Sequence, residues 1–301
     1  MRGHIVIGSR GSDLALYQAH LIQSHLAAVS KRDISIKIIK TAGDRIDSTP
    51  FDQMEGKGFF TKELEDSLLS GEIDVAVHSL KDLMTTQPAG LKLGAVGFRV
   101  DRRELLMICR DFRAGDGAFP VKAGAVVGTS AARRKAQVAA LNPNVQIVDL
   151  RGNVPTRIKR LREGKYDAIV IAAAGVERLK LDVSELEVIY LDPETFLPAP
   201  AQGILGIQIR SDDREIESIV SQLNDPRAEL EARLERGLLA MFDSGCSLPL
   251  GVLTEISENS YRLKAVLGVR NGTEWLTPRR IEVTGTDVEQ ILAEAYRGLT
   301  N

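Results

Sequence analysis

Residues 4–16 read HIVIGSRGSDLAL, and this stretch decides the fold class. The apolar run at 4–8 predicts a short strand. Apolar positions recur at helical spacing from Ser12 to Val29 and predict a helix, which Ser12 or Asp13 can cap. An arginine, Arg10, stands in the short turn between them. The opening of the chain is therefore a strand, a turn with a cation, and a helix.

The same alternation continues through the first two-thirds of the chain. We expect further strands at 34–39, 74–77, 91–96, 105–109, 125–128, 145–149 and 167–173. We expect further helices at 59–69, 131–141 and 154–163. This order predicts parallel sheets with helices on both faces, in two similar α/β units that divide near residue 100. Residues 197–203 interrupt the pattern as a crossing or hinge, and the apolar run 204–209 is expected to return to the first sheet.

The C-terminal third has a different pattern. Helical spacing recurs at 214–223 and 227–241. Two strand runs, 261–269 and 275–283, are separated by the hairpin signal Asn271-Gly272. Thr286 and Glu289 form a capping-box pattern that opens a last helix. These elements predict a small α+β domain.

Composition excludes several classes of protein. The chain has 301 residues, of which 44% are hydrophobic and 27% charged, as in a soluble protein with two or three domains. No apolar run reaches membrane-spanning length, and the N-terminus turns polar too early for a signal peptide. Two cysteines cannot form a disulfide framework, which favours the cytoplasm. A net charge of −2 argues against a general nucleic-acid binder.

Arginine clusters follow predicted strand ends and open predicted helices. They lie at 8–12, 128–134 and 150–153. In open α/β sheets the ligand crevice lies at the carboxyl ends of strands, where helix N-termini favour anions and arginine offers a bidentate fork. Each cluster alone has a simpler interpretation as a solvated helix face. Three clusters at equivalent positions favour a site for a small polyanion.

Two further residues have competing interpretations. Asp82 follows the strand 74–77 and is either a turn cap or an acid that stabilises a developing cation in the crevice. Cys246, in the loop DSGCSLP at 243–249, is a nucleophile, an attachment point or a thiol without function. Cys109 ends an apolar run and is expected to act as a small hydrophobe.

Other sequence features argue against a phosphate-binding loop and against a metal site. Lys57 lies between Gly56 and Gly58, but the spacing does not match a phosphate-binding loop, so a mobile loop with a lysine is expected. The histidines and cysteines lack the spacing of a metal site, and no metal is expected.

Taken in order along nearly the whole chain, these motifs resemble those of the porphobilinogen deaminase (hydroxymethylbilane synthase) family. The motifs that carry the resemblance are 8–16, 56–60, 77–82, 127–130, 133–134, 150–154, 197–199 and 245–246. The resemblance implies an α/β fold with two doubly wound domains like periplasmic binding proteins, plus a small α+β C-terminal domain. The expected boundaries are 1–100 with 201–222 for the first domain, 101–200 for the second and 223–301 for the third.

The resemblance also implies a transferase of porphyrin and heme biosynthesis. Such an enzyme deaminates four molecules of porphobilinogen and joins them head to tail into hydroxymethylbilane. It does so on a dipyrromethane cofactor held by a thioether, here at Cys246. A cytoplasmic monomer without nucleic-acid or membrane partners is expected.

By position, the resemblance assigns roles to individual residues. Asp82 is expected to stabilise the pyrrole N–H as charge develops, and Lys81 to contact the cofactor. The expected carboxylate binders are Arg10, Ser12, Arg133, Arg134, Arg151, Arg157 and Arg178. Further cofactor or substrate contacts are expected from Lys57, Thr129, Ser130, Gly152, Asn153 and Gln202. The chain departs from the family pattern at Asp13, Gln53, Met84, Ala131 and Ser244.

Two other functions remain open at this point. A non-catalytic anion-binding protein of the same shape would need neither Cys246 nor Asp82. An arginine-rich nucleic-acid binder would need net positive charge and stacking aromatic residues, which make up only 5% of the chain. Intact mass separates all three, because only the deaminase carries a covalent dipyrrole.

Overall fold

The computed structural model describes residues 3–41, 61–242 and 248–301. The described residues divide into two compact units. One holds residues 3–41, 61–100 and 203–233, and the other holds 101–202, 234–242 and 248–301. The chain therefore leaves the first unit after residue 100 and returns to it at residue 203.

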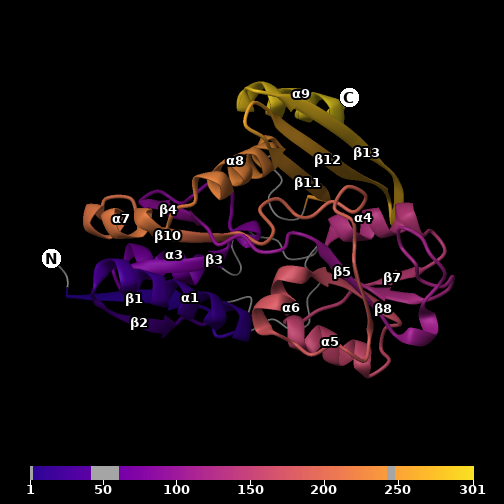
Figure 1. Ribbon diagram of the computed structural model, residues 1–301, viewed down its shortest axis with the longest axis horizontal. Coiled ribbons are helices and arrows are strands. Elements are labelled where there is room, and N and C mark those ends of the chain that lie inside the picture. The colour runs from indigo at the N-terminus through magenta and orange to yellow at the C-terminus, as the bar shows by residue number, and fades with distance from the viewer. Residues whose placement is uncertain (1–2, 42–60, 243–247) are drawn as a thin grey trace. The chain divides into compact units, whose positions relative to one another are not determined.

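The first unit is built on a five-stranded sheet of order β2-β1-β3-β10-β4 (Figure 1). Its strands are β1 (His4–Ser9), β2 (Asp33–Ile38), β3 (Val75–Ser79), β4 (Leu91–Gly97) and β10 (Leu205–Arg210). β1 is parallel to β2 and β3, whereas β10 is antiparallel to both β3 and β4. The prediction that the run at 204–209 returns to the first sheet is confirmed, but the sheet is mixed and not wholly parallel.

Helices cover both faces of this sheet because its strands are apolar on both sides. Ile22 of α1 (Asp13–Ser30) and Ile216 of α7 (Arg214–Val220) pack on the face that carries Ile7 and Val77. Leu64 and Leu68 of α3 (Lys62–Leu69) pack on the opposite face, against Ala76. The short helix η4 (Ser221–Leu223) follows α7.

The second unit repeats this topology with the order β7-β6-β8-β5-β9. Its strands are β5 (Glu104–Ile108), β6 (Val126–Gly128), β7 (Gln146–Val148), β8 (Ala168–Ala172) and β9 (Glu187–Tyr190). Its helices are η3 (Arg110–Phe112), α4 (Ala132–Leu141), α5 (Val154–Arg162) and α6 (Ala173–Leu179). β6 is parallel to β7 and β8, and β5 is antiparallel to β8 and β9. β5 therefore holds the place that β10 holds in the first sheet.

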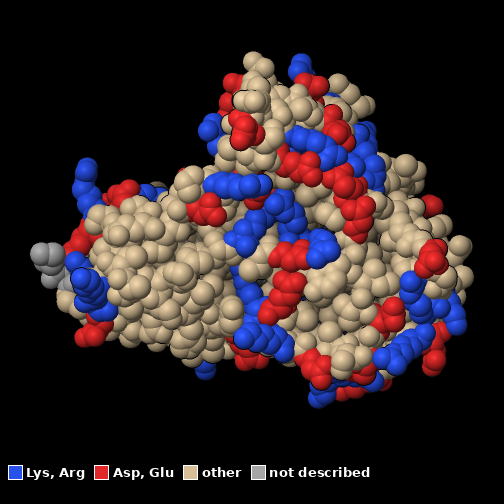
Figure 2. Space-filling view, in the orientation of Figure 1, with Lys and Arg blue, Asp and Glu red and all other residues tan. Residues whose placement is uncertain are grey.

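The second unit also contains a three-stranded antiparallel sheet, β11 (Leu250–Ile256), β12 (Tyr261–Asn271) and β13 (Glu274–Gly285). Its core packs Leu234 and Leu238 of α8 (Pro226–Met241) and Ile291 of α9 (Val288–Thr300) against Leu263 and Val283. Figure 2 shows lysine and arginine side chains interleaved with acidic ones over β12 and β13. This sheet with its helices is the small α+β part that the sequence predicts.

Several predicted boundaries need correction. The last helix is capped by Asp287, whose Oδ1 accepts from Gln290 N at 2.9 Å, so Thr286 is not the cap. The hairpin at Asn271-Gly272 is confirmed, and Gly272 adopts φ +58° there. Helix α6 and strands β9 and β11 were not predicted.

Among the described residues, no helix combines the length and apolar character that crossing a bilayer requires.

One buried histidine gives the first unit a pH-dependent stability. Burial, reinforced by the nearby Arg10 and opposed by a hydrogen bond with Gln208, lowers the pKa of His78 from 6.5 to about 4. The folded state therefore binds fewer protons at His78 than the unfolded state does. The stability that His78 contributes is complete above pH 6.5 and is lost as the pH falls toward 4.

We expect wild type to lose about 3 kcal/mol more stability than His78→Gln as the pH falls from 6.5 to 4. Glutamine keeps a donor for Gln208 and removes the titration. Urea unfolding at a series of pH values measures the difference. The exposed His20→Gln variant should follow wild type, and parallel curves for wild type and His78→Gln would refute the assignment.

Candidate active site

The carboxyl edge of the first sheet brings four predicted site residues into one region. Arg10 follows β1, and Ser12 begins α1 directly after it. Lys81 and Asp82 lie in the short helix η2 (Leu80–Asp82) that follows β3. Because β1 and β3 are parallel neighbours, with Gly8 opposite Ala76, both strand ends meet at the same edge.

The side chains at this edge have distinct environments. Ser12 is the N-cap of α1, and its Oγ accepts from Ala15 N at 3.4 Å. Asp13 lies in the first turn of α1, where a negative charge complements the helix dipole. Lys81 is half-buried and the Asp82 residue is exposed. Asp82 can therefore meet a ligand without any rearrangement of the core.

The carboxyl edge of the second sheet gathers several of the other predicted residues. Thr129 and Ser130 follow β6, residues 151–153 follow β7, and α6 follows β8. Thr129 N donates to Val148 O at 2.9 Å. Ser130 Oγ donates to Leu150 O at 2.5 Å and accepts from Leu150 N at 3.1 Å. These bonds hold the two strand ends together.

Arg133 and Arg134, in the first turn of α4, are buried on either side of one carboxylate. Arg133 Nη2 lies 2.5 Å from Glu104 Oε1, and Arg134 Nη2 lies 2.8 Å from Glu104 Oε2. Arg133 Nη1 also donates to Leu197 O at 2.7 Å. Burial lowers the pKa of Arg133 and Glu104 opposes this, and a guanidinium stays charged in either case. One carboxylate neutralises only one of the two guanidinium charges.

The turn that opens α5 needs a glycine. Gly152 has φ +95°, and a Cβ there would come within 2.8 Å of Thr156 Cγ2. Asn153 is the N-cap, and its Oδ1 accepts from Thr156 N at 2.9 Å. Arg157 Nε donates to Gly152 O at 2.7 Å, while Arg160 Nη1 donates to the carbonyl of Arg151. Arginines thus stand around a helix N-terminus that favours anions.

The remaining predicted residues divide into three groups. Arg178 is buried in the last turn of α6. Gln202 is fully buried, and its Nε2 donates to Arg102 O at 2.8 Å, so its amide holds the backbone of the second unit. Lys57 and Cys246 lie outside the described residues, as do Gln53 and Ser244.

Buried polar atoms test whether this edge fits an anionic pyrrole cofactor. Thr129 Oγ1 and Arg134 Nε are buried, and neither has a hydrogen-bond partner in the described part of the chain. Buried donors without partners are costly unless a ligand satisfies them. Ala131, the N-cap of α4, makes no side-chain cap bond. The donors, the excess guanidinium charge and the uncapped helix all suit carboxylate groups.

Sequence reasoning missed two residues of this site. Glu104 opens the apolar strand β5, and nothing in its neighbourhood marks it as the partner of Arg133 and Arg134. The second is Gln137. Its Oε1 accepts a hydrogen bond from Leu197 N at 2.7 Å, and its Nε2 donates to Leu197 O at 3.0 Å. Both contacts join residues far apart along the chain.

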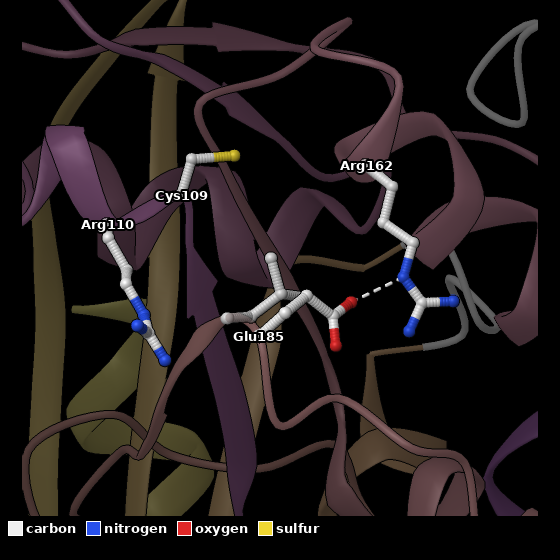
Figure 3. A pocket seen from close by; sticks show the side chains of 5 residues that line it. Cys109, Arg110, Arg162 and Glu185 are labelled. Atoms are coloured by element: carbon white, nitrogen blue, oxygen red, sulfur yellow. Dashed lines mark hydrogen bonds and ion pairs between the residues drawn. The ribbon is translucent and has the colours of Figure 1, made fainter.

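A separate shallow pocket in the second unit contains none of the predicted site residues. It is lined by Cys109, Arg110, Arg162, Glu185 and Leu186. Figure 3 shows Arg162 turned toward Glu185. Arg162 Nε donates to Glu185 Oε1 at 2.5 Å. Burial, with Asp167 and Asp111, raises the pKa of the half-buried Cys109 thiol. A raised pKa favours the protonated thiol over the nucleophilic thiolate, in keeping with the expected role of Cys109 as a small hydrophobe.

Comparisons with solved structures give only weak similarity. The Bordetella pertussis BvgS periplasmic VFT2 domain is 15% identical and gives a TM-score of 0.45, covering 77% of this chain and 93% of its own. The amino acid ABC transporter substrate-binding protein AbpA from Streptococcus pneumoniae is 13% identical, with a TM-score of 0.41, over 76% and 91%.

Comparisons of sequence are far stronger. The model for the porphobilinogen deaminase dipyrromethane cofactor binding domain matches residues 5–218, and that for the C-terminal domain matches 229–295. A porphobilinogen deaminase of Maridesulfovibrio salexigens is 41% identical over 93% of this chain and 89% of its own. One of Syntrophobacter fumaroxidans is 36% identical over 97% and 98%. The chain therefore belongs to the porphobilinogen deaminase family.

Proposed function

We propose that residues at the two carboxyl edges perform the porphobilinogen deaminase reaction. The carboxylate of Asp82 is the catalytic group, and the arginines bind the carboxylates of the substrate and cofactor. The observation that carries this proposal is the pair Arg133 and Arg134, buried on the single carboxylate of Glu104 with one positive charge in excess. A buried excess charge calls for an anionic partner. Porphobilinogen, with one acetate and one propionate group, supplies two carboxylates for each pyrrole.

Arginine suits this substrate for a geometric reason. Its planar fork donates two parallel hydrogen bonds to one carboxylate, which fixes the orientation of each pyrrole as well as its position. A growing chain of pyrroles accumulates negative charge. We propose that these carboxylates are bound by the arginines Arg10, Arg133, Arg134, Arg151, Arg157 and Arg178. Further cofactor or substrate contacts are proposed for Lys57, Lys81, Ser12, Thr129, Ser130, Gly152, Asn153 and Gln202.

Asp82 is proposed to act on the substrate pyrrole. Loss of ammonia leaves a cation delocalised over the ring, and the pyrrole N–H becomes more positive. A carboxylate at hydrogen-bond distance stabilises this state more than the neutral substrate, and so raises turnover more than affinity. The exposed position of Asp82 after β3 is compatible with such a contact.

The dipyrromethane cofactor supplies the pyrrole carbon to which the first substrate is joined. We propose that Cys246 holds it through a thioether. Domain boundaries at residues 100, 200 and 222 are also proposed, as is a cytoplasmic monomer. Low cysteine content supports the cytoplasmic location.

The attachment proposal predicts a mass difference. Purified protein should exceed its sequence mass by one dipyrromethane, and Cys246→Ala should lose that excess. Because a ligand bound only by the folded state stabilises it, the apo-protein should also melt at a lower temperature. Intact-mass spectrometry checks the first result, with Cys109→Ala as the control that retains the cofactor. Active protein without added mass would refute attachment.

The carboxylate-binding proposal predicts a contrast between two arginines. Arg151→Leu should weaken substrate binding about 10- to 100-fold, because one or two charge-assisted hydrogen bonds are lost. Arg297→Leu, at an exposed position of α9, should bind like wild type. The KM for porphobilinogen, measured for each of the two variants and for wild type, checks this contrast. Equal KM values would remove Arg151 from the site.

The catalytic proposal predicts that Asp82→Asn lowers kcat by roughly 100-fold or more, because the shape remains and the charge is lost. Asp82→Glu should retain part of the activity. Ammonia release by cofactor-loaded enzyme at saturating porphobilinogen measures kcat, and the exposed Asp212→Asn is the matched control. Wild-type turnover in Asp82→Asn would reduce Asp82 to a turn residue.

A further inference from the structure

A chain of two hydrogen-bonded amides, one fully buried and one half-buried, lies on the face of the first sheet that α3 covers. Gln208, fully buried on β10, donates through Nε2 to Gln87 Oε1 at 2.8 Å and to Glu65 Oε1 at 3.4 Å. Gln87 Nε2 in turn donates to Met84 O at 2.8 Å. Each amide nitrogen therefore donates to the next group along the chain. The chain ends at the backbone carbonyl of Met84, two residues after Asp82.

The Met84 carbonyl, which can only accept, fixes the direction of this chain, and His78 lies at its other end. Because both Nε2 hydrogens of Gln208 are used, its Oε1 must accept, and His78 Nε2 at 3.1 Å must donate. His78 is therefore the neutral Nε2–H tautomer. The amide of Gln208 cannot rotate without breaking all three contacts.

The backbone around Asp82 is held at both ends by contacts that depend on β10. Leu80 N donates to Ile204 O at 3.0 Å, and Leu83 N donates to Leu80 O at 3.3 Å, with Leu83 fully buried. Gln87 then holds Met84 O on the other side. The short turn that presents Asp82 thus lies between two anchors, one from the backbone before β10 and one from Gln208 on β10.

Apolar side chains cover much of the sheet face on which this network lies. Leu64, Leu68, Ile73, Ala76 and Leu91 pack around the same face of the sheet. A buried amide among such residues adds little net stability compared with an apolar side chain of the same shape. What it adds is a fixed direction for the groups it joins.

We propose that Gln208 and Gln87 are positioning residues for Asp82, which they hold through the Met84 carbonyl at the placement that catalysis requires. The inference rests on the proposed role of Asp82 in turnover. A misplacement of about 1 Å at a reacting group can cost on the order of 100-fold in rate, so a modest loosening of this turn is measurable.

The first test compares kinetic constants. Gln87→Leu and Gln208→Leu should lower kcat about 10-fold and leave the KM for porphobilinogen within about 2-fold, because the carboxylate binders are untouched. Gln222→Leu is the matched control, since Gln222 is exposed and its Nε2 donates to Ser218 O, four residues earlier in the chain. Gln87 lies on a half-buried segment, so its variant remains informative if Gln208→Leu folds poorly.

A double-mutant cycle separates positioning from general structural damage. In an Asp82→Asn background, Gln87→Leu should lower kcat by less than about 2-fold, because the group it positions has lost its charge. A structural defect would lower both backgrounds equally. Equal losses in the two backgrounds, or wild-type kcat in Gln87→Leu, would overturn the positioning role.

A second readout does not depend on activity. Amide hydrogen exchange of residues 80–88 should speed up several-fold in Gln87→Leu, in protein with and without its cofactor, and stay unchanged in Gln222→Leu. Unchanged exchange in Gln87→Leu would also overturn the proposal. If Asp82→Asn itself turned over normally, the proposed role of Asp82 would fail and positioning with it. If Asp82→Asn were slow and Gln87→Leu normal, positioning alone would fail.

Discussion

The insertion of β10 between β3 and β4 is the constraint on which the first unit depends. β10 is antiparallel to both neighbours and supplies the hydrogen bonds that join them. It also brings Arg210, whose Nη2 lies 3.0 Å from Asp74 and 2.8 Å from Asp213. Arg210 lies at the start of β3, whereas Leu205 pairs with Ser79 at the end that precedes Asp82, so both ends of β3 are held by residues that follow the entire second α/β sheet in sequence. Local folding of residues 3–100 alone cannot complete this edge.

Periodicity revealed most elements because each strand or helix leaves a local pattern. The direction of a strand leaves no such pattern, because the apolar sequences of the antiparallel strands β5 and β10 resemble those of the parallel strands around them. Helix α6 was missed because Ala173–Leu179 is short and contains a glycine. The arginine positions were predictable from strand ends. The function of the chain was predictable from the ordered motifs, whereas Glu104 was not, because its contact with Arg133 spans distant parts of the chain.

Two kinds of arginine cluster occur in the second unit, and their charge balance distinguishes them. Arg262 meets three carboxylates, those of Glu194, Glu255 and Glu282, at a partly exposed position on β12. Hydrogen bonds from Arg262 and Lys264, partly opposed by burial, lower the pKa of Glu194 to about 2. Acid is in excess there, so no anionic ligand is favoured. At Glu104 the ratio is reversed, with two buried cations on one acid. An excess of buried positive charge at a strand edge is what a polycarboxylate requires.

We propose that this protein builds its product as a growing pyrrole chain that stays covalently attached to the protein until release. The most direct measurement is intact-mass spectrometry of cofactor-loaded protein mixed with limiting porphobilinogen and quenched over time. We expect a ladder of protein masses, each step one deaminated porphobilinogen heavier and ending at four additions. The mass should return to its starting value as the tetrapyrrole is released. Tetrapyrrole formation with the protein at a single unchanged mass throughout would contradict it.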